Sequence, residues 1–355
     1  MNSWLAFLIL ISILVFFHEL GHFLVAKWCK VGVETFSIGF GPKIIKKKFG
    51  ETLYCISALP LGGYVKMVGE QKKSSVAPGD IARSFTHKKL YQKSLIVAAG
   101  PLFNFLLSIL IFFAIFQISG LFFYKPIIGQ VSDNSPALRA GIKPGDVIKE
   151  INGVKIEFWN DIHVQVEKSG GSMLEILLER GKRKVATSLK PELMAYKNSF
   201  HEDKTRYIMG VTVSGEKTHI SLNPFQAIYY SLQENWKITE LTIVSVWKMI
   251  AGSVPSDELG GPIRIAQLAG REAEKGVTNF AYFIALISIN LGIINLLPVP
   301  VLDGGHLMFF AVEAVTGREV SESVREKANQ VGIFLLVLLM IFAFYNDIIQ
   351  QINGG

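Results

Sequence analysis

Long runs of apolar residues dominate the hydropathy pattern of this chain. A helix needs about 20 mostly apolar residues to cross a hydrocarbon core of about 30 Å. The first two runs meet that length, the third is interrupted by prolines, and the fourth is short, so its ends should extend into the interface. We therefore predict four transmembrane helices, in the segments 1–26, 93–119, 279–310 and 331–350.

The stretches between these runs have other patterns. Apolar residues at helical spacing follow Asn223-Pro224 and stop near Gly252. This spacing predicts that the region 215–278 contains an amphipathic, membrane-associated helix. The alternative is a helix that packs in the core next to the segment 126–214. The segment 311–330 is predicted to be a loop.

Composition supports a membrane protein. Half of the residues are hydrophobic and the mean hydropathy is +0.36. Soluble globular chains rarely reach such a value. The expected fold class is therefore an α-helical polytopic membrane protein with about four transmembrane helices.

Basic residues gather in one loop. The net charge is +7, and the stretch from Lys27 to Lys93 has 13 Lys or Arg residues and only four acidic ones. The positive-inside rule places the loop 27–92 and the segment 311–330 in the cytoplasm, and the N-terminus and the stretch 120–278 outside. Because topology accounts for the basic excess, we expect the lipid bilayer as a partner and no nucleic acid.

The first apolar run contains an HExxH motif, His18-Glu19-Leu20-Gly21-His22. Residues at i and i+4 lie on one helix face, so His18 and His22 can bind the same ion. Glu19 points elsewhere and can act as a base toward water that zinc activates. An ionisable side chain inside a membrane costs free energy, so its presence there indicates a functional site. The motif therefore predicts a zinc site within the bilayer.

A catalytic zinc needs a third protein ligand and an open position. The third apolar run ends in a Pro- and Gly-rich stretch with Pro298, Pro300 and Asp303. Irregular backbone at membrane depth is tolerated where it is buried or lines a water-filled cavity. We assign Asp303 as the third ligand. His306 is the rival, with a capping or interfacial role as its alternative.

Two asparagines lie within the apolar runs. Asn290 either bonds a neighbouring helix or stabilises a developing oxyanion as a catalytic residue. Asn104 either contacts substrate or bonds a neighbouring helix. The residue types alone leave both alternatives open.

These motifs together resemble the site-2 protease family of intramembrane zinc metalloproteases, and within it the bacterial RseP/RasP-type branch. The resemblance rests on the HExxH motif, Ala99 to Asn104, Gly260-Gly261-Pro262 and the run from Asn290 to Gly305. It implies zinc held by His18, His22 and Asp303, with Glu19 as base. It also implies single-pass membrane protein substrates: anti-sigma factors already trimmed by another protease, and remnant signal peptides.

The segment 126–214 is similar to one PDZ domain of α+β type. The similarity lies in turn-rich motifs such as Ser135-Pro136-Ala137 and Ile151-Asn152-Gly153. It implies a carboxylate-binding loop formed by Tyr207, Ile208, Met209 and Gly210. A steric filter against bulky ectodomains is the alternative, and we favour it.

Short β-prone runs between glycines predict a small sheet within the loop 27–92. A cytoplasmic hairpin is one interpretation. The family resemblance implies instead a membrane-associated sheet whose edge strand receives substrate. An unwound substrate needs partners for its backbone, which an edge strand would supply. The expected substrate contacts are Gly39, Phe40, Gly41, Gly62, Gly63, Tyr64, Asn104, Pro298 and Pro300.

The predicted activity is zinc-dependent peptide-bond hydrolysis by a multi-pass protein of the bacterial cytoplasmic membrane, with the N-terminus and the PDZ domain outside. A metal transporter also places His and Asp in helices, but it has no need of the Glu19 base. A catalytically inactive PDZ scaffold has no need of intact metal ligands.

Overall fold

The computed structural model describes residues 2–70, 76–198, 202–252 and 260–352. Residues 71–75, 199–201 and 253–259, which belong to the predicted segments 27–92, 126–214 and 215–278, lie outside the described residues. The chain forms two compact units. The first comprises Met1–Ile115 and Ile228–Gly355, and the second comprises Phe116–Ala227.

Helices form most of the first unit. Four of them are long and apolar enough to span a membrane, as predicted: α1 (Ser3–Trp28), α2 (Leu90–Ser119), α7 (Val277–Leu296) and α9 (Glu322–Ile352). The remaining helices are η1 (Pro78–Arg83), α5 (Pro224–Ile250), α6 (Pro262–Glu274) and α8 (Asp303–Thr316).

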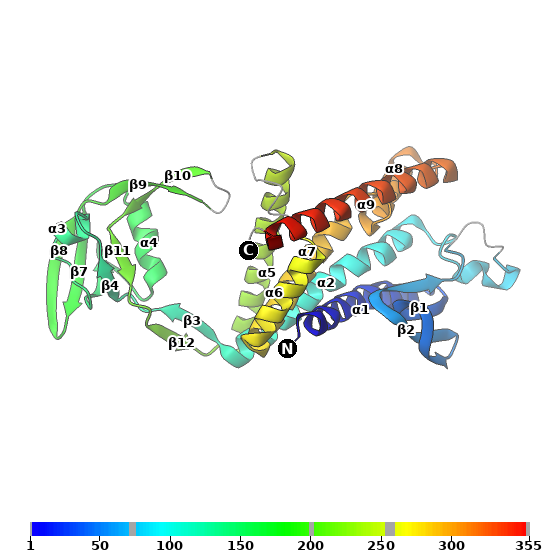
Figure 1. Cartoon of the computed structure of the whole chain (residues 1–355), viewed down its shortest axis with the longest axis horizontal. Coiled ribbons are helices and arrows are strands. Elements are labelled where there is room, and N and C mark those ends of the chain that lie inside the picture. Colours follow the sequence, from blue (N-terminus) through cyan, green and yellow to red (C-terminus); the bar gives the residue numbers. More distant parts are fainter. Residues whose placement is uncertain (1, 71–75, 199–201, 253–259, 353–355) are drawn as a thin grey trace. The chain divides into compact units, whose positions relative to one another are not determined.

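One apolar core joins α1, α2, α6 and α7, which run side by side in Figure 1. Small residues let these helices approach closely. A Cβ on Gly21 of α1 would lie 2.3 Å from the carbonyl oxygen of Ala99 of α2, so a larger residue would push the two helices apart. The fully or nearly buried residues of this core are Ala6, Phe7, Leu10, Leu14, Leu107, Ala266, Ala269 and Ile284.

The β-sheet of this unit lies beside α1 (Figure 1) and consists of β1 (Val33–Phe49) and β2 (Thr52–Met67). The strands are longer than the short runs predicted from sequence. Gly39 and Gly41, with φ of 89° and 85°, bend β1 without ending it. Before the bend, residues 33–38 pair with 63–67 on one side, and residues 35–38 also pair with 53–56 on the other side. After the bend, residues 43–49 pair with 52–57.

The predicted segment 279–310 contains two helices, α7 and α8, rather than one. Pro298 and Pro300 lack the N–H groups that would continue α7, and Val301 has a φ of 86°. After the break, α8 runs to Thr316 and α9 begins at Glu322, so the loop predicted at 311–330 is much shorter. Its first residue, Gly317, has a φ of 68° and ends α8.

The predicted start of α5 is also visible in the structure. Asn223 and Gln226 cap α5 reciprocally, each side chain accepting a hydrogen bond from the other's backbone N–H, at 2.9 and 3.0 Å.

The N-terminus of α6 is capped from another helix. The buried carboxylate of Asp347 on α9 accepts hydrogen bonds from the N–H groups of Gly261 (2.7 Å) and Ile263 (2.9 Å).

The second unit is mostly β-structure around its own core. A four-stranded antiparallel sheet has the order β6-β5-β7-β8, and three further strand pairs complete the unit. The strands of the sheet are β5 (Val147–Ile151), β6 (Val154–Lys155), β7 (Leu174–Arg180) and β8 (Arg183–Leu189). The paired strands are β3 (Leu121–Tyr124) with β12 (Lys217–Ile220), β4 (Ile128–Val131) with β11 (Val211–Val213), and β9 (Glu192–Lys197) with β10 (Asp203–Ile208).

Two short helices complete this unit, α3 (Pro136–Arg139) and α4 (Trp159–Lys168). The Ser135 side chain caps α3 by accepting a hydrogen bond from the Leu138 N–H at 3.2 Å. Asn152 and Gly153 both have positive φ, 50° and 75°, and make the tight turn between β5 and β6. The turn-rich motifs recognised in the sequence thus lie at turns and at a helix start.

An ion pair with a buried carboxylate connects the loop before β5 to β7. Asp146 is 1% exposed, and its carboxylate accepts hydrogen bonds from Arg180 Nε (2.8 Å) and Nη2 (2.7 Å) and from the Lys143 backbone N–H (2.8 Å). Burial raises the pKa of Asp146, but these hydrogen bonds and the Arg180 charge outweigh it and hold the pKa below its ordinary value. The carboxylate therefore stabilises the fold in its ionised form.

Asp146→Asn is expected to destabilise the second unit by about 1.5–3 kcal/mol at neutral pH, because it removes charged hydrogen bonds from a buried site. The contribution is complete above the ordinary aspartate pKa of about 4 and is lost as the pH falls through the lower folded-state pKa. Hydrogen exchange in β7 of the full-length protein measures the effect. The exposed Asp133, changed to Asn, is the control. Equal protection in both variants at neutral pH would contradict this role.

Candidate metal centre and active-site cavity

Three predicted ligands from two helices meet in the first unit. His18 and His22 lie one turn apart on α1, and Asp303 is the first residue of α8. Asp303 Oδ2 is 3.1 Å from His18 Nε2, and Asp303 Oδ1 is 3.6 Å from His22 Nε2. The two Nε2 atoms are 3.2 Å apart. Within the described ranges, these residues form the one cluster of three or more His, Cys, Asp or Glu side chains spaced to hold a metal.

This geometry suits zinc. Bonds of about 2.0–2.1 Å in a tetrahedral arrangement place ligand atoms roughly 3.3 Å apart. The three separations, 3.1, 3.2 and 3.6 Å, lie around that value. Two imidazoles and one carboxylate also form a common donor set for a catalytic zinc, which leaves a fourth position open. His18, His22 and Asp303 can therefore hold this metal.

Two glycines allow α8 to begin beside the ligands. A Cβ on Gly304 would lie 2.2 Å from the Leu297 carbonyl oxygen, and a Cβ on Gly305 would lie 2.4 Å from the Val299 carbonyl oxygen. Any side chain at either position would collide with the backbone that connects α7 to α8. The Asp-Gly-Gly sequence thus provides a ligand followed by two residues small enough for the chain to fold back at that point.

A cavity of about 340 Å³ opens beside the ligands. Glu19 lines it together with His18, His22 and Asp303, but does not belong to the ligand cluster. A carboxylate that faces the same space without holding the metal can accept a proton there. The other lining residues are Gly63, Tyr64, Val65, Met67, Glu70, Phe85, Thr86, Lys93, Val97, His306, Phe310, Glu319 and Arg325.

The stretch 63–67 of β2 forms one side of this cavity. It pairs with residues 33–38 along one edge only, among the described residues. Gly63 lets this strand approach α1, because a Cβ there would lie 2.9 Å from Val15 and 3.1 Å from the Cγ of Glu19. Tyr64, the next residue, lines the cavity. The structure therefore brings an edge strand to the metal ligands.

The other predicted contacts of the sheet lie farther along it. Phe40 stacks on Tyr64 with 6.2 Å between ring centroids, and a Cβ on Gly62 would collide with the Phe40 ring. Gly39 and Gly41 form the bend of β1. Among the described residues these four positions are outside the cavity lining, as are Pro298 and Pro300. Their substrate role stays a prediction.

The two asparagines have different surroundings. Asn104 is fully buried, with its Nδ2 3.2 Å from His18 Nδ1. Asn290 Oδ1 accepts a hydrogen bond from Thr242 of α5 at 2.9 Å. Among the described residues, neither lines the cavity. The Asn290 contact fits the helix–helix alternative, and an oxyanion role, which stays a prediction, would rest on its Nδ2 group.

In the second unit, the four residues of the predicted carboxylate loop line a groove of about 160 Å³. Tyr207 and Ile208 end β10, and Met209 and Gly210 follow them. A Cβ on Gly210, whose φ is 82°, would lie 2.2 Å from Ser135 Cβ, so this turn needs glycine. Helix α4 contributes the opposite side through Trp159, Ile162, His163 and Val166.

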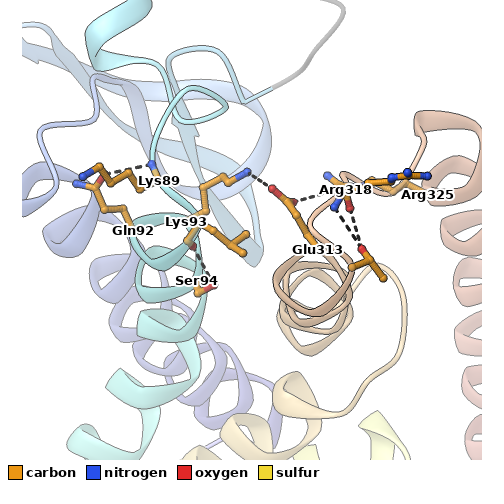
Figure 2. Close-up of polar contacts among 9 residues, drawn as sticks. Lys89, Gln92, Lys93, Ser94, Glu313, Arg318 and Arg325 are labelled. Carbon is orange, nitrogen blue, oxygen red and sulfur yellow. Dashed lines mark hydrogen bonds and ion pairs between the residues drawn. The ribbon is translucent and has the colours of Figure 1, made fainter.

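Sequence reasoning did not identify Lys93 and Arg325, two charged residues that line the cavity. Figure 2 shows three of the helices meeting at Glu313 of α8. Its carboxylate lies 3.4 Å from Lys93 Nζ of α2 and 3.6 Å from Arg325 Nη2 of α9. Partly buried charges of opposite sign attract strongly when water is scarce. This cluster therefore holds α8, and with it Asp303, in place between α2 and α9. The sequence feature that could have indicated this cluster is Lys93, a lysine within an otherwise apolar helix.

Comparison with known proteins adds the family. The profile of Peptidase family M50 matches residues 6–339. Three bacterial relatives are each named "Putative zinc metalloprotease". The Campylobacter jejuni protein is 37% identical over 99% of this chain and 94% of its own length. The Agrobacterium fabrum protein is 36% identical over 98% and 96%, and the Clostridium acetobutylicum protein is 34% identical over 96% and 96%.

Among solved structures, the PDZ domain of an SdrC-like protein from Listeria monocytogenes matches 26% of this chain and 85% of its own, at 21% identity and a TM-score of 0.20. The family assignment rests instead on the near full-length sequence matches, which agree with four apolar helices and a zinc-sized ligand cluster. This chain belongs to peptidase family M50, the site-2 protease family, and is a multi-pass membrane zinc metalloprotease.

Proposed function

We propose that this protease cleaves single-pass membrane proteins within the bilayer, including anti-sigma factors already trimmed by another protease and remnant signal peptides. One observation carries the proposal. The ligands His18, His22 and Asp303 share a cavity with Glu19, and the HExxH motif lies within an apolar helix long enough to span a membrane. A site at that position acts on chains that lie in the membrane.

Glu19 performs the proton transfers of the proposed mechanism. His18, His22 and Asp303 would hold the zinc, which when bound would supply the Lewis acidity that activates water and polarises the peptide carbonyl. Glu19 accepts a proton from the attacking water and returns it to the leaving amine nitrogen. Its place beside the ligands, outside the ligand cluster, supports this role.

The edge strand 63–67 aligns the substrate. A transmembrane helix conceals its peptide bonds, so a substrate segment must unwind before hydrolysis, and its freed backbone groups need new partners. Strand addition to this edge supplies them beside the ligands. The one-sided pairing of residues 63–67 and the place of Tyr64 in the cavity support this step.

We place the N-terminus and the second unit outside the cytoplasmic membrane, and the sheet with its neighbouring loop on the cytoplasmic side. The distribution of basic residues supports this orientation. Lys27 and Lys30 follow the apolar part of α1, and Lys88 and Lys89 precede α2. The other end of α1, Asn2-Ser3, has no basic residue.

The second unit serves as a size filter. Its own core and sheet make a compact body directly before α5 in the chain, with a sequence similar to a PDZ domain. Such a body obstructs substrates with bulky folded ectodomains and admits those already trimmed. Peptide capture is the alternative, and the groove between α4 and residues 207–210 supports it.

Cleavage in proteoliposomes tests the proposal. A single-pass substrate with a short outer segment is expected to be cut, and the same substrate with a large folded ectodomain is expected to remain intact. A zinc chelator is expected to abolish cleavage, and added zinc to restore it. Cleavage that persists unchanged in chelator would refute the mechanism, and equal cleavage of both substrates would refute the filter.

A further inference from the structure

One stripe of α2 lies directly against the two ligand imidazoles. Ile96, Gly100 and Asn104 are spaced four residues apart and so share a helix face. A Cβ on Gly100 would lie 2.3 Å from His22 Nε2 and 2.9 Å from His18 Cε1. Only glycine lets the helix approach both rings this closely, and one polar group of the stripe meets each ring.

The first polar group orients His22. The carbonyl oxygen of Ile96 is 2.8 Å from His22 Nδ1. A carbonyl can only accept a hydrogen bond, so Nδ1 carries the proton and donates it. In the neutral ring the lone pair is then on Nε2, the atom that faces Asp303. The backbone of α2 thus selects the tautomer of this ligand.

The second polar group meets His18 in a different way. His18 Nε2 faces Asp303 and His22, so a metal bound there requires the ring proton on Nδ1 and an acceptor beside it. The Asn104 amide is the group in contact with Nδ1, at 3.2 Å. An amide presents either NH₂ or oxygen, and half a turn about its last bond exchanges the two.

The exchange replaces the contact of Asn104 Nδ2 with His18 Nδ1 by a contact of the oxygen with the same atom. Asn104 Oδ1 is buried and has no hydrogen-bond partner in the part of the chain that the structure describes. Rotation therefore breaks no hydrogen bond of the oxygen and lets it accept from His18 Nδ1–H. The Asn104 backbone is itself fixed, because its carbonyl oxygen accepts a hydrogen bond from Ser288 Oγ of α7 at 2.8 Å.

We propose that Asn104 is a positioning residue for the metal centre, which holds the His18 ring in the orientation and tautomer that zinc requires. The proposal rests on the ligand set of the proposed function and deepens it. Asn104, with no exposed surface, orients His18 as the Ile96 carbonyl orients His22. Helix α2 contributes no ligand to the cluster, yet it orients two of the three.

Zinc affinity of the purified full-length protein, measured by competition with a chromophoric chelator, tests the proposal. Asn104→Leu removes both polar groups at similar volume and is expected to weaken zinc binding about 10–100-fold, the usual loss for a group that supports a ligand. Asn104→Asp retains an acceptor for His18 Nδ1–H and is expected to bind zinc as tightly as the wild type. Asn104→Ala replaces the Leu variant if that variant does not fold.

Asn235→Leu is the matched control. Asn235 is also a buried asparagine of this unit, and it hydrogen-bonds Ser108 rather than a ligand. Zinc affinity equal to that of the wild type in Asn104→Leu, or an equal loss in the Leu and Asp variants, would overturn the proposal. A wild type that binds zinc but cleaves no membrane substrate would refute the proposed function, and the same variants would still decide the role of Asn104. A wild type that binds no zinc would overturn both.

Discussion

Glu19→Gln is expected to lower the cleavage rate by about 10²–10⁴-fold, the usual contribution of a general acid–base group. Glutamine has nearly the same shape and cannot accept the proton of the attacking water. Because Glu19 lies outside the ligand cluster, the variant should retain zinc. Initial rates on a membrane substrate, together with the zinc content of the same samples, measure the effect.

Glu240→Gln is the control for this experiment. It makes the same chemical change at an exposed position of α5, and we expect cleavage at the wild-type rate. A Glu19→Gln protein that retains zinc and cleaves as fast as this control would exclude Glu19 as the base.

Asp303→Asn is expected to weaken zinc binding by more than about 100-fold and to abolish cleavage at low free zinc. Loss of a supporting residue alone costs about 10–100-fold in affinity, and loss of a direct ligand should cost more. The neutral amide is also a poorer ligand for a cation. Chelator competition and cleavage assays at several free zinc concentrations test both effects.

His306→Gln provides the contrasting variant. His306 lies one helical turn after Asp303 and lines the same cavity, but is absent from the cluster of the described residues. His306 was the rival ligand in the sequence. Because it lies outside the cluster, its variant should still bind zinc. If His306→Gln loses zinc while Asp303→Asn retains it, the third ligand is misassigned.

The sequence predicted the features that depend on local spacing. Four apolar runs gave the four membrane-spanning helices, and the i, i+4 rule gave the two histidines on one face of α1. Asp303 was predictable because a carboxylate at membrane depth is costly unless it binds a cation or lines a polar cavity. The Asn152-Gly153 turn was similarly readable from residue type.

Features that depend on packing were not predictable. Nothing in the spacing of α2 shows that Ile96 and Asn104 face the imidazoles, because that depends on how closely α2 approaches α1. Lys93 and Arg325 likewise meet Glu313 only after three helices have assembled. Strand β1 is also longer than predicted, because Gly39 and Gly41 bend a continuous strand rather than end it.

The proposed metal ligands come from opposite ends of the chain, and this bears on biosynthesis. A ribosome that has released only α1 has produced two imidazoles, one fewer than the three protein ligands of a catalytic zinc site. The carboxylate follows only after the second unit and α7 have been made. With the proposed ligand set, the nascent protein is expected to have no complete metal site until translation is nearly finished, and a product truncated before α8 is expected to be inactive.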